Sequence, residues 1–234
     1  WALDVYEWAP PEISAILSGA GVTAGIFALY KFLPVTGEMW IPLLTLVGLL
    51  TFVFSHLIAL KQEKTNRMLG YSSVGQAGLI AAVISLKNIL GNDFVFIASS
   101  LTIIHALSKA GLFWLSSLTQ YEYIKDWAGI KKRPVLIFLT GLFIFALLGL
   151  PPFPSFFAKW MLIMNLSGVY AGWLIAAILI GSLLEAAYLF RWFGLAVKGD
   201  VLKENPLKKS GYIVPLMTAI LILLLSAIFP VQRP

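Results

Sequence analysis

The sequence has no cysteine and only two histidines among its 234 residues. The absence of cysteine excludes disulfide bonds, thiolate metal sites and iron–sulfur clusters within these residues, and two histidines are too few for a haem-rich electron carrier. Charged residues are also scarce at 12% of the chain, whereas apolar residues make up 59% and the mean hydropathy is +0.88. These values are typical of an integral membrane protein. We therefore expect no redox catalysis, no catalytic residue, no metal and no cofactor in this chain.

Apolar stretches of about 20 residues, long enough to cross about 30 Å of hydrocarbon, recur along the chain. After a lead-in over residues 1–10, we place them at 11–32, 39–60, 68–89, 92–118, 135–165, 171–195 and 212–229. The sequence thus predicts an all-α membrane domain of about seven transmembrane helices in a lipid bilayer. The chain begins with Trp1 rather than methionine and shows no signal sequence. We therefore expect an amino-terminal part to be missing or to belong to another chain.

The cations between these segments are distributed unevenly. One side of the predicted bilayer has only Lys31, Lys87 and Arg233. The other side has Lys61, Lys64, Arg67, Lys125, Lys131, Lys132, Arg133, Arg191, Lys198, Lys203, Lys208 and Lys209. Because cytoplasmic loops carry an excess of Lys and Arg, this pattern predicts a cytoplasmic lead-in and an external Pro234. The net charge of +6 then reflects topology and not nucleic-acid binding.

The scarcity of Asn and Gln and the lack of cysteine favour a thermophilic prokaryote. The expected location is therefore the cytoplasmic (inner) membrane of a prokaryote, which the chain would cross several times.

Three prolines, Pro151, Pro152 and Pro154, interrupt the segment 135–165. Proline lacks the backbone N–H and clashes with the carbonyl four residues back, so we expect a helix that is discontinuous near 149–154. The freed carbonyls must face protein or a watery cavity, because lipid cannot satisfy them. Lys159 follows in the second half-helix, an arrangement that transporters use repeatedly. The alternative is a simple kink whose lysine reaches for the headgroups.

Three charged side chains lie well inside the predicted segments: Lys109, Lys159 and Glu185. A lysine at mid-membrane costs at least about 2.5–3.5 kcal/mol, so it should face a cavity or a partner. His105 precedes Lys109 by four residues and shares its helix face, and the two groups suit a proton relay near neutral pH. The alternative is a lysine permanently paired for helix association. Glu185 is a natural partner for Lys159.

The second histidine, His56, lies towards the cytoplasmic end of the segment 39–60. A lone histidine at that depth is more often a packing residue than a proton carrier. We retain it as an additional candidate site residue.

Four motifs, in this order and spacing, resemble those of one protein family. They are Trp1-Ala2-Leu3-Asp4 with Ala9-Pro10-Pro11-Glu12-Ile13-Ser14-Ala15; Ala59-Leu60-Lys61-Gln62 with Arg67-Met68-Leu69-Gly70-Tyr71-Ser72-Ser73; His105-Ala106-Leu107-Ser108-Lys109-Ala110-Gly111-Leu112-Phe113; and Gly149-Leu150-Pro151-Pro152-Phe153 with Phe157-Ala158-Lys159-Trp160. The chain resembles the carboxy-terminal half of the antiporter-like subunits of complex I, Mrp-type Na⁺/H⁺ antiporters and membrane-bound hydrogenases.

This resemblance implies a proton channel built from two inverted repeats, of which this chain would be the second. Lys109 would be the central relay lysine, His105 its neighbour and Lys159 the exit-side residue. The partners would be other membrane subunits of a redox-driven or Mrp-type complex, with H⁺ as the translocated ion and Na⁺ as the alternative coupling ion. The first repeat, with its own glutamate and lysine, should precede Trp1.

Three positions depart from the family pattern. Thr23 stands where the family often has a bridging lysine, His56 stands where asparagine is usual, and Leu3 stands where proline is usual in the entry motif. The first departure favours a rival interpretation, a structural membrane-arm subunit without ion flux of its own. The second rival is a stand-alone secondary transporter.

Overall fold

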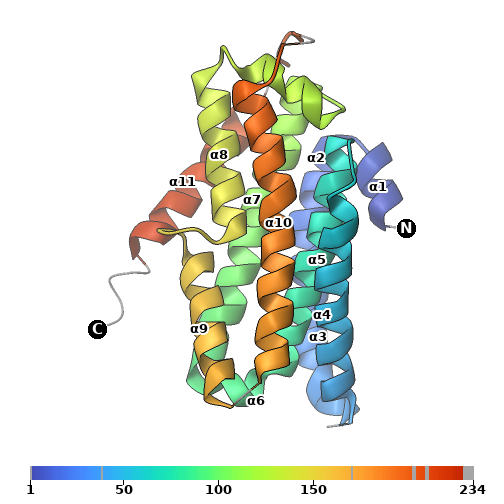
Figure 1. Cartoon of the computed structure of the whole chain (residues 1–234), viewed down its shortest axis with the longest axis vertical. Coiled ribbons are helices and arrows are strands. Elements are labelled where there is room, and N and C mark those ends of the chain that lie inside the picture. The colour runs from blue at the N-terminus through green and yellow to red at the C-terminus, as the bar shows by residue number, and fades with distance from the viewer. Residues whose placement is uncertain (1, 38, 170, 202–203, 209–210, 229–234) are drawn as a thin grey trace.

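The computed structural model describes residues 2–37, 39–169, 171–201, 204–208 and 211–228. The helices in these ranges stand side by side in an elongated bundle, and an isolated bridge between Lys64 and Tyr123 is the β interaction found there (Figure 1). In chain order the elements are α1 (Ala2–Trp8), α2 (Pro11–Ile16), the π-helical turn η1 (Leu17–Gly21), α3 (Val22–Thr36), α4 (Trp40–Ala59), α5 (Thr65–Ser85), α6 (Lys87–Leu90), the 3₁₀ turn η2 (Gly91–Asp93), α7 (Phe94–Thr119), the 3₁₀ segment η3 (Ile124–Ile130), α8 (Pro134–Leu148), α9 (Pro154–Gly168), α10 (Gly172–Lys198) and α11 (Ile213–Ile228).

Five helical runs within the described residues are long and apolar enough to cross a membrane. They are Pro11–Val35, Trp40–Ala59, Thr65–Ser85, Lys87–Thr119 and Gly172–Lys198, and the shorter apolar helices α8 and α11 stand with them. The prediction of an all-α membrane protein is confirmed. The bounds of the predicted segments, and that each segment crosses the bilayer, stay predictions.

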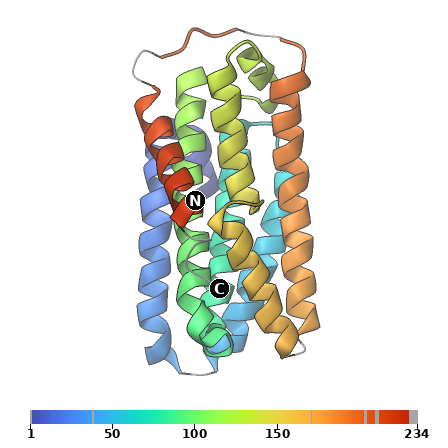
Figure 2. The same cartoon turned by 90° about the vertical axis from the view of Figure 1, so that its left-hand side faces the viewer.

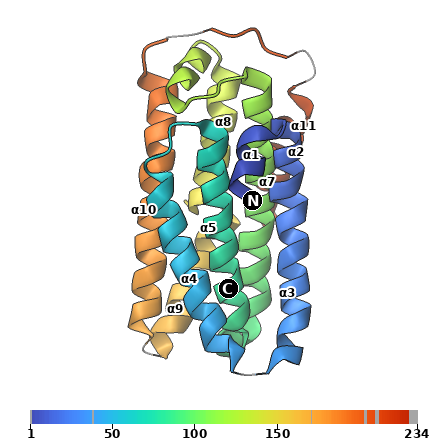
Figure 3. The ribbon, with the colours of Figure 1, turned by 90° about the vertical axis from the view of Figure 1, so that its right-hand side faces the viewer.

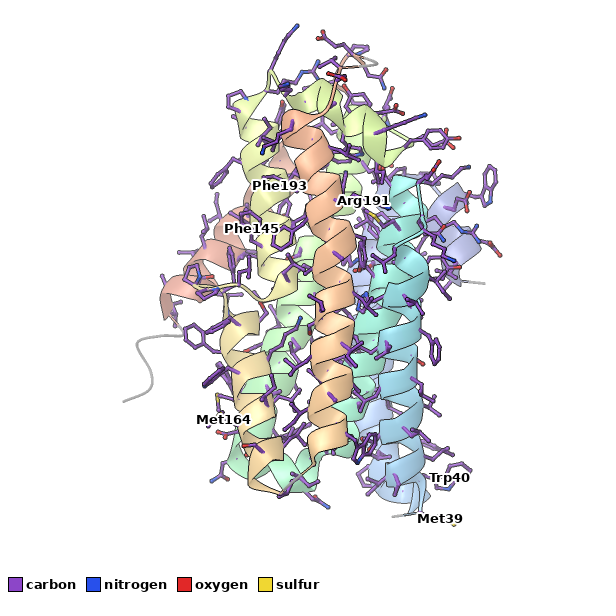
Figure 4. The ribbon with its side chains drawn as sticks, in the orientation of Figure 1. Met39, Trp40, Phe145, Met164, Arg191 and Phe193 are labelled. Carbon is purple, nitrogen blue, oxygen red and sulfur yellow. The ribbon has the colours of Figure 1, made fainter. Side chains whose placement is uncertain are left out.

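The connections gather at the two ends of the bundle (Figures 1 and 2). Helix α6, which contains Lys87, lies at one end, and η3, which contains Lys125, lies at the other. In Figure 4, Met39 and Trp40 project outwards at the α6 end. This separation agrees with the uneven distribution of cations in the sequence. Which end faces the cytoplasm stays a prediction, and Trp1 and Pro234 lie outside the described residues.

Helices α5 and α7 form the centre of the bundle, and their side chains are buried along most of their length. Helices α4 and α5 approach each other closely where Gly48 and Gly78 face each other. A Cβ atom added to Gly78 would lie 2.6 Å from the carbonyl oxygen of Gly48. Small residues at such positions let two membrane helices approach until their backbones touch.

The first long helix changes its winding in the middle. Five residues of π-helix, Leu17–Gly21, join α2 to α3 without a break in direction. Within this turn the Ser18 hydroxyl is buried and lies 2.8 Å from the Ser73 hydroxyl of α5. Thr23, one turn later, instead donates to its own helix at the Gly19 carbonyl, at 2.6 Å.

The connection between α7 and α8 forms a cap over one end of the bundle. Its short 3₁₀ segment buries Trp127, whose indole N–H donates to the Thr65 hydroxyl at 3.0 Å and whose ring meets Trp192 edge-on. The sequence analysis placed residues 119–134 between two predicted segments and expected no helix there. It missed this structure because a 3₁₀ segment of seven residues is too short to give a recognisable helical periodicity.

The lead-in over residues 1–10 contains helix α1, which packs against α5 (Figure 3). Its Tyr6 ring is buried and stacks on Phe113 of α7. Beside it, the Glu7 carboxylate accepts a hydrogen bond from Arg67 and lies 3.0 Å from the Lys64 ammonium. The lead-in is therefore an integral part of the bundle.

Replacing Gly78 with alanine should destabilise the protein, because the new methyl group meets backbone atoms of α4 that cannot turn aside. Overpacking of this kind costs about 1–3 kcal/mol. Heating the purified variant in detergent should show a lower unfolding temperature than the parent. Gly25→Ala is the matched control, since a Cβ there meets nothing within 4 Å. Equal unfolding temperatures for the two variants would contradict the close contact.

The attachment of α1 should depend on pH through Glu7. The hydrogen bond from Arg67, followed by that from Lys64, lowers the pKa of the Glu7 carboxyl from its usual 4.5. A carboxyl whose pKa is lowered on folding stabilises the folded state above its unfolded pKa, and this contribution disappears as the pH falls through the folded pKa. Glu7→Gln should therefore lower the unfolding temperature near neutral pH, and the difference from the parent should close below about pH 4.5. A difference that does not change with pH would argue against the ionic contact.

Candidate functional site

The break between α8 and α9 is built by local sequence. Helix α8 ends with Gly149 in the left-handed conformation, at φ +73°, which glycine adopts without strain. The amide of Gly149 donates to Ala146 and that of Leu150 donates to Phe145, the pairing of a Schellman cap. Helix α9 then starts at Pro154, where a missing N–H costs nothing. The predicted discontinuity near 149–154 is found at this point, midway along the bundle (Figure 2).

The carbonyls freed by the break are satisfied inside the protein. The Ser155 hydroxyl donates to the Ala146 carbonyl at 2.6 Å, and the Lys159 ammonium donates to the Leu148 carbonyl at 3.2 Å. Above the break, Phe145 of α8 lies beside Phe193 of α10 (Figure 4). The two rings meet edge-on, with 5.4 Å between their centres. The kink interpretation fails for Lys159, because its side chain turns into the protein and is only 8% exposed.

Lys159 has a second acceptor in the bundle. Its ammonium lies 3.3 Å from the Glu185 carboxylate of α10, which is completely buried. The Gln76 amide of α5 donates to both oxygens of this carboxylate, at 2.8 and 2.9 Å. A buried carboxylate needs such partners, because removing a charge from water costs several kcal/mol. The pairing of Lys159 with Glu185 that the sequence suggested is present in the structure.

Lys109 lies in the interior of α7 and is 0% exposed. Its ammonium donates to the Leu69 carbonyl of α5 at 2.9 Å. The Ser73 hydroxyl donates to the same carbonyl at 3.0 Å. Within the described residues no carboxylate lies in hydrogen-bond contact with this lysine. Lys109 is therefore held by a neutral acceptor, and it can lose its proton without breaking an ion pair.

The two histidines are both buried, in different surroundings. His105 shares the α7 face of Lys109, and neither of its ring nitrogens has a hydrogen-bond partner among the described residues. His56 of α4 has its Nδ1 atom 2.9 Å from the Tyr188 hydroxyl of α10. The electrostatic field of the Glu185 carboxylate reaches both Lys109 and His56. The structure thus gathers Lys109, Lys159, Glu185 and both histidines in one interior.

Two kinds of predicted residue lie outside this interior cluster. Thr23 lines a shallow apolar groove with Ala106 and Ala110, and its hydroxyl is used within its own helix. The prolines 151, 152 and 154 shape the break and contribute no polar group of their own.

Sequence reasoning missed Gln76, Tyr188 and Ser155. A glutamine in the middle of an apolar span was a signal for Gln76, because such a side chain needs a buried partner. Ser155 directly follows the proline run, where free carbonyls were expected. Tyr188 gave no signal beyond its position one turn after Glu185.

Comparison with known proteins identifies the family. The family described as NADH:quinone oxidoreductase/Mrp antiporter, transmembrane, matches residues 1–185. The chain belongs to this family. NADH-quinone oxidoreductase subunit N of Moorella thermoacetica is 30% identical over 240 residues, which cover 98% of this chain and 50% of that protein. The resemblance inferred from the four motifs is confirmed.

Solved structures give the same result. A chain of the membrane-bound sulfane sulfur reductase, an archaeal respiratory membrane complex, has a TM-score of 0.82 and 30% identity over 99% of this chain and 49% of its own length. A chain of the Mrp complex of Dietzia sp. has a TM-score of 0.84 at 15% identity, over 99% of this chain and 53% of its own length, and shows the shared fold alone. This chain spans about half the length of the relatives that it matches.

The contact between Lys159 and Glu185 predicts strong energetic coupling. Lys159→Met or Glu185→Gln alone leaves one charge buried without its partner, which should cost about 3–5 kcal/mol. The double variant removes both charges and should recover most of this loss. Unfolding temperatures in detergent would measure the coupling.

The two single variants and the double variant form a double-mutant cycle. The exposed pair Lys132–Glu204, at 3.1 Å, is its control. Exposed pairs contribute about 0–1 kcal/mol, so its cycle should show little coupling. Additive losses in the Lys159–Glu185 cycle, similar to those of the exposed pair, would argue against a functional ion pair.

Proposed function

We propose that this chain is the proton-translocating second half of an antiporter-like membrane subunit. In this proposal Lys109, His105, Glu185 and Lys159 carry the proton, with H⁺ as the cargo and Na⁺ as the alternative coupling ion. The observation that supports it best is the buried contact of Lys159 with both Glu185 and the Leu148 carbonyl. One ammonium between two acceptors can move a short distance from one to the other.

The surroundings of Lys109 support a relay role. A buried ammonium that donates to one neutral oxygen, the Leu69 carbonyl, is a poorly stabilised charge, so its proton is easily passed on. The Glu185 carboxylate lies within electrostatic reach of Lys109. When Lys159 moves to the Leu148 carbonyl, this carboxylate is less well compensated, and it would draw the proton of Lys109 towards its side of the cluster.

His105 is the group that we assign to proton exchange with Lys109. Both ring nitrogens are buried without a partner among the described residues, a costly state for an imidazole. Water molecules at these nitrogens would remove that cost, since buried polar groups commonly bind internal water. Water at His105 would also connect it to the neighbouring lysine.

The partners in this proposal are other membrane subunits of a multisubunit complex. The relatives are named as subunits of such complexes, and this chain covers about half of their length. The subunit would lie in the cytoplasmic membrane of a prokaryote, with the end that contains η3 in the cytoplasm. The basis for this orientation is the excess of cations at that end.

A structural subunit without ion flux is the second candidate. The observation in its favour is that the Thr23 hydroxyl is engaged within its own helix and replaces a protonatable side chain. No contact among the described residues favours a stand-alone solute transporter.

Lys109→Met should abolish ion pumping while leaving the complex assembled. The relay loses its central protonatable group, so pumping should fall by at least about 100-fold, since a positioned proton-transfer group contributes about 10²–10⁴-fold. Proton uptake by membrane vesicles that contain the intact complex would measure this, with electron transfer and subunit content followed in parallel. Repeating the measurement with K⁺ in place of Na⁺ in the medium would show whether transport requires Na⁺ or proceeds with H⁺ alone.

Lys61→Met is the matched control, since this lysine is exposed between α4 and α5. It should pump as the parent does. Normal pumping by an assembled Lys109→Met complex would leave the structural role as the better interpretation.

A further inference from the structure

His56 is enclosed by three helices and is 0% exposed. Its ring lies against α5 at Gly75, where an added Cβ atom would be 2.8 Å from the Nε2 atom. On its own helix Phe52 meets the ring edge-on, with 4.7 Å between the centres. Any residue larger than glycine at position 75 would displace the imidazole, so the space between α4 and α5 fits the His56 ring closely. Packing alone would not require a titratable group here.

The two ring nitrogens have different surroundings. Nδ1 forms a hydrogen bond with the Tyr188 hydroxyl, whereas Nε2 has no hydrogen-bond partner among the described residues. Either member of the Nδ1–hydroxyl pair can donate while the ring is neutral. In the charged ring Nδ1 must donate, and the tyrosine oxygen can accept. His56 therefore has a partner that accommodates both of its protonation states.

The charged groups around His56 give it a place in the cluster. Burial is the strongest influence against a charge on the imidazole, Glu185 of α10 attracts such a charge, and Lys159 of α9 and Lys109 of α7 oppose it. The imidazole of His105, also on α7, interacts with it as well. A proton on His56 is thus favoured when the carboxylate is charged and one of the lysines is neutral or has moved away.

If Lys159 moves away from Glu185, the carboxylate needs a second cation as its counter-charge. When the ammonium shifts fully to the Leu148 carbonyl, the carboxylate keeps only the neutral amide of Gln76. An uncompensated buried carboxylate is strongly unfavourable. Tyr188, which holds His56, lies one turn after Glu185 on α10, so the imidazole is attached to the element that carries the carboxylate.

We propose that His56 is a second counter-charge for Glu185, which takes up a proton when Lys159 leaves the carboxylate. The proposal rests on the proton relay proposed above. The proton comes from the Lys109 ammonium, which becomes a neutral amine as the imidazole becomes charged, so the cluster keeps its total charge. When Lys159 returns to Glu185, the imidazole releases the proton into the translocation path. His56 is then a site of the relay.

The test is the pH dependence of proton pumping by the intact complex in membrane vesicles, between about pH 5.5 and 8.5, where histidines titrate. His56→Asn retains hydrogen-bonding groups but cannot titrate, so pumping should fall and the inflection present in the parent profile should disappear. Tyr188→Phe retains the ring but removes the hydroxyl, so the inflection should move by about one pH unit. A structural role would lower pumping equally at every pH.

Gly75→Ala tests the same site without changing a polar group. The new methyl group would push the imidazole away from its position, so this variant should reproduce the altered pH profile of Tyr188→Phe. Gly194→Ala on α10 is the control, since a Cβ there meets nothing within 4 Å, and its profile should match that of the parent.

The outcomes separate this inference from the proposed function. Loss of pumping in Lys109→Met, together with parental pH profiles in His56→Asn and Tyr188→Phe, would overturn the role of His56 and leave the relay in place. Normal pumping in Lys109→Met would overturn the relay, and the role of His56 with it. If His56→Asn does not assemble, the Tyr188→Phe profile decides, and a parental profile there overturns the proposal.

Discussion

The ion pair between Lys159 and Glu185 is the interaction on which the interior of this bundle depends. A carboxylate with no solvent exposure is tolerable only with a cation and with donors on its remaining lone pairs, and Lys159 and Gln76 supply these from two other helices. Helices α5, α9 and α10 are thereby tied together at one point. The other buried polar groups, Lys109 and the two histidines, lie in the electrostatic field of that point.

The break between α8 and α9 brings this pair into place. An unbroken helix would use the Leu148 carbonyl for its own hydrogen bonding, whereas the Gly149 cap and the prolines leave it for the lysine. A carbonyl at a helix carboxyl end carries partial negative charge, so it competes with the carboxylate for the same ammonium. The Leu148 carbonyl and the Glu185 carboxylate are thus alternative acceptors for the Lys159 ammonium.

Much of this arrangement could be predicted from sequence, because membrane burial leaves few interpretations for a charge or a proline run. The discontinuity at 149–154 and the importance of Lys109, Lys159 and Glu185 follow from that constraint. Lateral neighbours could not be predicted, because periodicity assigns a residue to a face but not to a partner helix. Gln76 and Tyr188 therefore emerged only from the fold. The burial of Tyr6 and Trp127 was missed because both lie in short helical segments outside the apolar runs.

The π-helical turn at Leu17–Gly21 has a consequence for how this helix can vary. An α-helix turns by about 100° per residue, and a wider turn accommodates an additional residue while the flanking parts keep their direction. The turn therefore sets the rotational phase of α3 independently of α2. It allows Ser18 to point towards α5 while Thr23 lies at the rim of an outer groove. A one-residue deletion within this turn would therefore convert it to ordinary α-helix and leave the side chains of α3 on their present faces. The same deletion later in α3 would rotate every following side chain by about 100°, and the lipid-facing and protein-facing sides of that part of the helix would no longer match their surroundings.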